Sequence, residues 1–122
     1  MGTHRNLQVW ENGIDLVVLI YQITSHFPKH ELFGLVSQLQ RAAVSIPANI
    51  SEGAARNHSK EFIRFLRISF GSLSELETLI LIAVKIQYIN KEEEDRLFER
   101  IRLLSSQLSK LISAIEKSSV TR

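Results

Sequence analysis

Apolar residues recur at steps of three and four along four stretches of the chain, and polar residues fill the positions between them. This spacing places the apolar side chains on one face of a helix, whereas a half-buried strand would need strict alternation. It predicts helices at about 7–27, 31–56, 60–88 and 91–117. Because short turns separate these helices, we expect one all-α domain over residues 1–122, an antiparallel up-down-up-down four-helix bundle.

The second stretch carries two helical stripes on nearly opposite faces. The apolar stripe comprises Leu32, Val36, Leu39, Ala43, Ile46, Ile50 and Gly53. The polar stripe comprises Gln38, Arg41, Ser45, Asn49, Glu52 and Arg56. Both stripes continue in register through Pro47, which removes one backbone hydrogen bond and crowds the carbonyl four residues earlier. We therefore predict a second helix kinked at Pro47, with two shorter helices as the alternative.

Proline and capping residues mark the expected helix ends. The residue before Pro28 is disfavoured in helical geometry, so the first helix should end there. Ser59 is the expected N-cap of the third helix. Asn90 and Glu93 have the spacing of a capping box, in which each side chain bonds the backbone of the other residue, so the fourth helix should begin after Asn90.

The other helices have apolar stripes of their own. The first helix has Trp10, Ile14, Val17, Tyr21 and Thr24, widened by Leu16, Ile20, Ile23 and Phe27. The third has Phe62, Leu66, Ser69, Leu73, Leu76, Ile80 and Ala83, and the fourth has Leu97, Ile101, Leu104, Leu108, Leu111 and Ile115. Other apolar residues fall off these stripes: Val18 and Leu19 in the first helix, and Ile63, Ile68, Leu79 and Ile82 in the third. An apolar strip left uncovered usually marks an interface, so we predict a homo-oligomer. The alternative is that wide stripes are ordinary in globular helices.

Composition narrows the possible classes of protein. The chain has 122 residues, with 15 Lys and Arg against 13 Asp and Glu, and it contains no cysteine. Disulfides and thiolate metal sites are therefore excluded. Because the N-terminal sequence lacks a basic start followed by an apolar run, we expect no signal peptide and a cytoplasmic protein. No apolar run is long enough to suggest a membrane span.

Catalytic and metal-binding patterns are weak. His26, His30 and Glu31 could form a loop cluster, but Pro28 separates the two histidines and a surface turn is the favoured interpretation. The sequence has no Glu-x-x-His pair, no nucleophile elbow and no glycine-rich phosphate loop. We therefore expect no enzymatic activity, no metal and no cofactor.

Basic residues gather around the turn between the second and third helices. Arg56, Lys60, Arg64 and Arg67 could neutralise several phosphates, which predicts electrostatic binding of RNA or DNA with little sequence specificity. The alternative interpretation is a solvated helix face. At the level of function, the alternative is a protein–protein adaptor that binds no nucleic acid.

The polar stripe of the second helix differs from an ordinary surface, because its side chains are mostly short and its neighbours include several alanines. Small residues permit close helix approach. We predict that Arg41, Asn49 and Glu52 serve subunit contact or local architecture, and that Pro47 shapes the helix. A plain solvent-exposed face stays open as the alternative.

Three segments resemble a known family. They are LQVWENGIDL at Leu7–Leu16, ELFGLVSQLQRAAVSIPANISEG at Glu31–Gly53 and EFIRFLRISFGSLSELETL at Glu61–Leu79. The chain is similar to the bacterial four-helix bundle proteins encoded in intervening sequences of 23S rRNA genes. The resemblance implies a ring-like homopentamer. Relatives of that family include the accessory variability determinant proteins of diversity-generating retroelements, which bind nucleic acid and a reverse transcriptase, so the resemblance implies partners of these kinds.

Overall fold

The computed structural model describes residues 4–120, with side chains described for residues 8–118. Four α-helices make up the fold: α1 His4–Thr24, α2 Leu35–Ala55, α3 Ser59–Lys85 and α4 Lys91–Val120. A short 3-10 helix, η1 Lys29–Glu31, lies between α1 and α2. The described part of the chain contains no strand, so the all-α prediction is confirmed.

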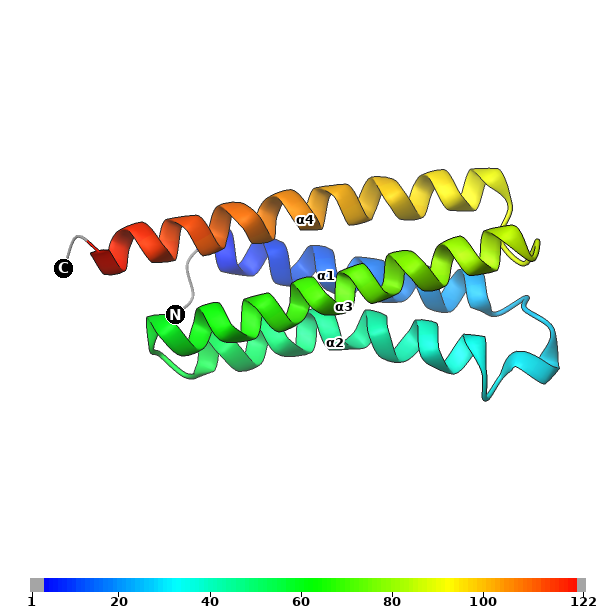
Figure 1. Ribbon diagram of the computed structural model, residues 1–122, viewed down its shortest axis with the longest axis horizontal. Helices are drawn as coiled ribbons and strands as arrows, with labels where there is room; N and C mark the ends of the chain where they lie inside the picture. Colours follow the sequence, from blue (N-terminus) through cyan, green and yellow to red (C-terminus); the bar gives the residue numbers. More distant parts are fainter. Residues whose placement is uncertain (1–3, 121–122) are drawn as a thin grey trace.

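The helices lie side by side along the long axis of the molecule, and successive helices run in opposite directions (Figure 1). Helix α1 packs against α2 and α4, and α3 packs against the same two helices. Within residues 4–120 the diagonal pairs, α1 with α3 and α2 with α4, do not approach each other. Each helix therefore has two neighbours, one inward face and one outward face.

In three of the four helices the predicted stripe lies in the core, which also contains Leu19 of α1 and Leu79 of α3, two residues that fall off the stripes. Phe62, Leu66, Leu73, Leu76 and Ile80 of α3 are all fully buried. The apolar stripe of α2 is buried from Val36 to Gly53, as predicted, and that of α4 is buried from Leu97 to Leu111. The exception in α2 is Leu32, which lies before the helix and is 54% exposed.

In α1 the predicted stripe is partly wrong. Thr24 is buried, but Trp10, Ile14 and Tyr21 are exposed. The inward face is instead formed by residues predicted only to widen the stripe, together with Val9: they are Val9, Leu16, Ile20 and Ile23. Helix α1 has two apolar stripes, and spacing alone does not say which of them meets the other helices.

Several helix ends in the structure differ from the predicted ends by a few residues. Helix α1 ends at Thr24 rather than at 27, and α2 begins at Leu35 rather than at 31. The chain uses the residues between them to cross from one helix to the next, through η1 and a turn that ends at Gly34. The Glu31 carboxylate accepts the Leu35 N–H at 3.2 Å and so caps α2 from a position that was predicted to be helical.

The ends of α3 and the start of α4 have identifiable causes. Helix α3 stops at Lys85, three residues early, because Gln87 adopts a left-handed φ of 68° and the Tyr88 N–H donates to the Ala83 carbonyl at 2.8 Å. Ser59 is not the N-cap, since extended His58 holds that position without a side-chain bond. The capping box is confirmed: the Glu93 N–H donates to Asn90 Oδ1 at 2.8 Å, and the Asn90 N–H donates to Glu93 Oε1 at 3.0 Å. Helix α4 runs to Val120, three residues past the predicted end.

Pro47 lies inside α2, which continues without a break from Leu35 to Ala55. It is buried against α1: a β-carbon added at Gly13 would lie 3.3 Å from Pro47 Cβ. The proline therefore packs where the two helices come close together at Gly13, and a continuous helix replaces the two-helix alternative. The kink itself stays a prediction.

Candidate functional site

Three surfaces carry the residues that the sequence singles out, and they lie on different sides of α2. The first is the hairpin cluster of Arg56, Lys60, Arg64 and Arg67, at the turn from α2 to α3. The second is the polar stripe, which runs along the α3 side of α2. The third is an apolar surface on the α1 side, which the sequence does not delimit.

Carboxylates pair with most of the positive charges of the hairpin cluster. Arg56 pairs with Glu52 at 3.0 Å, and Arg64 pairs with Glu61 at 3.1 Å. Arg67 pairs with Glu116 of α4, also at 3.1 Å. Within residues 4–120 Lys60 makes no ion pair, so three carboxylates offset all but one of the four positive charges. The hydrogen bond from Arg64 lowers the pKa of Glu61 below its ordinary value, which keeps that carboxylate charged.

Phe65 organises two of these arginines. The guanidinium carbons of Arg56 and Arg64 lie 5.2 Å and 4.5 Å from the centre of its ring. Both cations are held beside one aromatic face by cation–π attraction while they remain exposed to solvent. Phe65 is buried, as its apolar character suggested, and its second role as a platform for arginines has no signal in the spacing.

The polar stripe is partly a contact between α2 and α3. The Asn49 amide donates to the Ser45 carbonyl at 2.8 Å and to Ser45 Oγ at 2.9 Å. The Ser45 and Ser72 hydroxyls are 2.8 Å apart, and the buried Ser69 hydroxyl donates to the Ile46 carbonyl at 2.9 Å. Short polar side chains thus join the two helices inside the protomer, which favours the architectural role for Asn49.

Arg41 and Glu52 do not approach each other. Glu52 pairs with Arg56, whereas Arg41 is exposed and makes no ion pair in the described part of the chain. Arg41 lines two shallow grooves. One contains Tyr21 and Val44, and the other contains Ser72 and Glu75. Arg41 therefore stands at the border between the polar stripe and the apolar surface.

The apolar surface spans the outer sides of α1 and α2. We define the α1–α2 face as Trp10, Ile14, Val18 and Tyr21 on α1 with Ser37, Gln40, Val44, Ala48, Ser51 and Ala55 on α2. No residue of this set is charged. The two helices are joined here by a hydrogen bond from Gln40 to Thr24 at 3.3 Å, and Tyr21 and Val44 line one groove. The groove that Tyr21 and Val44 line therefore spans both helices.

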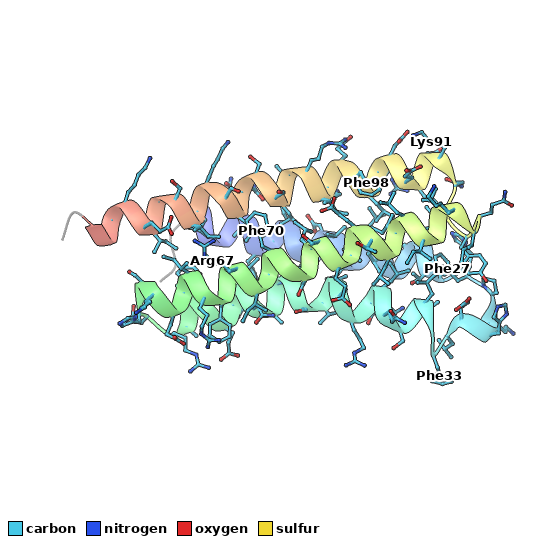
Figure 2. The ribbon with its side chains drawn as sticks, in the orientation of Figure 1. Phe27, Phe33, Arg67, Phe70, Lys91 and Phe98 are labelled. Carbon is cyan, nitrogen blue, oxygen red and sulfur yellow. The ribbon has the colours of Figure 1, made fainter. Side chains whose placement is uncertain are left out.

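Phe33 extends this face toward one end of the bundle. It lies on the turn before α2, is 92% exposed and projects away from the helices (Figure 2). With Leu32 it lines the same groove as Tyr21 and Val44. The periodicity placed residues 31–34 in a helix, so the exposure of this phenylalanine could not be predicted from it.

The histidines do not converge on a metal site. His26 Nε2 lies 2.8 Å from Glu93, and His30 Nε2 lies 3.8 Å from Glu31. Within the described residues no group of three or more His, Asp or Glu side chains could hold a metal ion. None of the helices between residues 4 and 120 is long and apolar enough to cross a membrane.

Comparison with known proteins identifies the fold. The family described as 23S rRNA-intervening sequence protein matches residues 5–110. A crystal structure with a similar fold is that of a protein of unknown function from the S23 ribosomal protein family of Bacteroides thetaiotaomicron VPI-5482. Its TM-score is 0.81 at 20% sequence identity, over 89% of this chain and 98% of that chain. No curated protein matches the chain. The relation to accessory variability determinant proteins stays a prediction.

Proposed function

The chain belongs to the 23S rRNA-intervening sequence protein family, and from that premise we propose that it is a non-enzymatic subunit of a homo-oligomer. The observation that carries the proposal is the α1–α2 face. Exposed contiguous apolar surface on a small protein marks an interaction site more often than a free surface. Burying such a face against another copy removes it from water without the need to desolvate a charge.

The face is suited to a protein partner rather than to a nucleic acid. Trp10 and Tyr21 are aromatic residues of the kind enriched in interface cores, and Val18 and Val44 add apolar area beside them. Charged groups are depleted at such cores, as they are here. Arg41, at the border of the face, has the position of a rim residue.

Mass measurement by light scattering tests the proposal. We expect the mass of two or more copies of the 13.9 kDa protomer, and the family resemblance indicates five copies. A mass of one protomer that persists as protein concentration is raised would refute assembly. It would favour the adaptor function, in which a different protein covers the α1–α2 face.

Electrostatic binding of nucleic acid is the second candidate function, and the arginines held on Phe65 are the observation that favours it. Exposed ion pairs contribute only about 0–1 kcal/mol, so phosphates can replace Glu52 and Glu61 as partners of these arginines. Arginine also matches the geometry of a phosphate group better than lysine does.

Fluorescence anisotropy with a generic single-stranded RNA tests this second function. Affinity should fall steeply between about 50 mM and about 200 mM salt, because bound cations are released from the RNA. Arg64→Glu should weaken binding, whereas Arg102→Glu, an exposed arginine on α4, should have a smaller effect. Affinity that is independent of salt, or equal loss from both variants, would remove the hairpin cluster as the binding site.

A further inference from the structure

We propose that the α1–α2 face of one copy packs on the outer side of α3 of the next copy, at Gly71. The inference rests on the proposed homo-oligomer and names the surface that covers its apolar face. The contact joins two different surfaces of the same chain. Three independent features of α3 support it.

The first feature is Gly71 itself. A glycine within a helix is unfavourable relative to alanine, so its presence needs a cause. Gly13 and Gly53 have causes inside the protomer, because a β-carbon at either position would come within 3.3 Å of a neighbouring side chain. Gly71 is exposed, and within the part of the chain that the structure describes nothing outside its own helix would lie within 4 Å of a β-carbon there. The protomer alone does not need this glycine, whereas a helix of another copy in close approach would.

The second feature is the set of apolar side chains on the same side of α3. Ile68 precedes Gly71 by three residues and Ile82 follows it by eleven, so the three share one outward side of the helix. Ile68 is 40% exposed and Ile82 is 46% exposed. Gly71 is therefore flanked by exposed apolar side chains, which complement the large residues Trp10 and Tyr21 of the α1–α2 face.

The third feature is charge complementarity. Glu75 lies one turn after Gly71, is exposed and makes no ion pair within the described residues. Arg41, at the border of the α1–α2 face, also makes none. The two residues line one groove of the protomer but stay farther apart than an ion pair allows. Contact between unlike faces brings Arg41 of one copy to Glu75 of the next.

A contact of the α1–α2 face with itself would satisfy fewer of these features. It would leave Gly71, Ile68 and Ile82 in solvent, and it would leave Glu75 of α3 without an ion-pair partner. A contact between unlike faces uses both surfaces of every copy. Repetition of such a contact produces a closed ring when the rotation between copies closes, and a filament when it does not.

Disulfide cross-linking tests the contact directly, because the chain has no cysteine of its own. Val44→Cys labels the α1–α2 face and Ile68→Cys labels α3. Under mild oxidation we expect a product of twice the 13.9 kDa protomer mass only when the two variants are mixed. Leu103→Cys on α4, which is 43% exposed against 42% for Val44, is the matched control and should give no product with Ile68→Cys.

The outcomes separate this inference from the proposed function. Cross-linking of Val44→Cys to itself, in a protein that light scattering finds oligomeric, would overturn the contact with α3 and keep the homo-oligomer. Equal cross-linking by the Leu103→Cys control would also overturn the contact. A protomer mass in light scattering, with no cross-linking in any mixture, would overturn both proposals.

Charge exchange between variants provides a second test. Arg41→Glu and Glu75→Arg should each dissociate the assembly when studied alone, because each places like charges across the contact. The double variant Arg41→Glu/Glu75→Arg should regain the mass of the assembly, since every contact between copies then pairs opposite charges. A double variant that stays dissociated while remaining helical, or a Glu75→Arg variant that assembles normally alone, would overturn the pairing of Arg41 with Glu75.

Discussion

Gly53 of α2 lies against Phe65 of α3 so closely that a β-carbon at position 53 would come within 2.7 Å of Phe65 Cβ. The same β-carbon would lie 3.0 Å from Phe62 Cδ1. Helices α2 and α3 therefore come into close contact near their shared turn. This approach also sets the position of the ring on which Arg56 and Arg64 are held.

Gly53→Ala should accordingly destabilise the protein. The added methyl group forces Phe65 or the backbone of α3 to move, and overpacking of this kind costs about 1–3 kcal/mol. Urea unfolding measures the loss. Ser106→Ala, an exposed change on α4, should stay within about 0.5 kcal/mol of the parent. A Gly53→Ala variant as stable as the parent would contradict the close approach.

Val44→Glu should dissociate the assembly without unfolding the protomer. The change puts a charge in the middle of the α1–α2 face, where burial against another copy would leave it unpaired. Leu103→Glu on α4 is the matched control, because Leu103 and Val44 are almost equally exposed, at 43% and 42%. Light scattering should find a smaller mass for the Val44 variant alone, and circular dichroism should find both variants helical. Retention of the full mass by Val44→Glu would speak against this face as the interface.

Asn90→Ala should remove half of the capping box and cost about 1 kcal/mol. The Asn90 side chain accepts the Glu93 N–H at 2.8 Å, and alanine leaves that donor without a protein partner. Asn90→Asp keeps the acceptor and should restore most of the stability. Chemical denaturation of the three proteins checks the order, and equal losses from the alanine and aspartate variants would be inconsistent with a capping role.

Tyr88 should make the protein less stable in alkaline solution. Burial, and then the hydrogen bond that its hydroxyl donates to Glu31, raise the pKa of Tyr88 above its ordinary value of 10.0. Because the folded state has the higher pKa, the stabilisation is fully present below pH 10.0, the unfolded value, and is lost as the pH rises through the folded pKa.

Tyr88→Phe removes this titration, so it is the control for the alkaline effect. The parent should lose stability relative to the phenylalanine variant as the pH is raised above the ordinary tyrosine range, which denaturant unfolding at a series of pH values can follow. A difference between the two proteins that stays constant across this range would show that Tyr88 is not linked to folding.

Much of the bundle could be predicted from periodicity, because three of the helices bury the main apolar stripe that the spacing identifies. Phe62, Leu66 and Leu73 are buried as their spacing indicates. Spacing failed where two apolar stripes compete, since Trp10 and Tyr21 fit a helix face as well as Leu16 and Ile20 do. It also failed at residues 31–34, where the pattern is helical but the chain must turn to reach α2.

The candidate surfaces were less predictable than the core. The sequence identified the basic residues Arg56, Arg64 and Arg67, but not that carboxylates from three different places offset them. Glu116 is the clearest case, because it lies 49 residues from Arg67 in the chain and meets it only when α4 packs beside α3. Long-range ion pairs of this kind leave no periodic signal.

The amino-acid sequence by itself determined that there are four amphipathic helices, where the capping box starts the fourth, and which family the chain belongs to. The helices and the capping box depend on residues close to one another in the chain, so local spacing and hydrogen-bonding chemistry are sufficient to reveal them, whereas the family follows from the match over residues 5–110. Only the tertiary structure decided which stripe of α1 faces outward and that, among the described residues, nothing outside its own helix would meet a β-carbon at Gly71. Both depend on which helices pack together, because a side chain is buried only by what lies across from it.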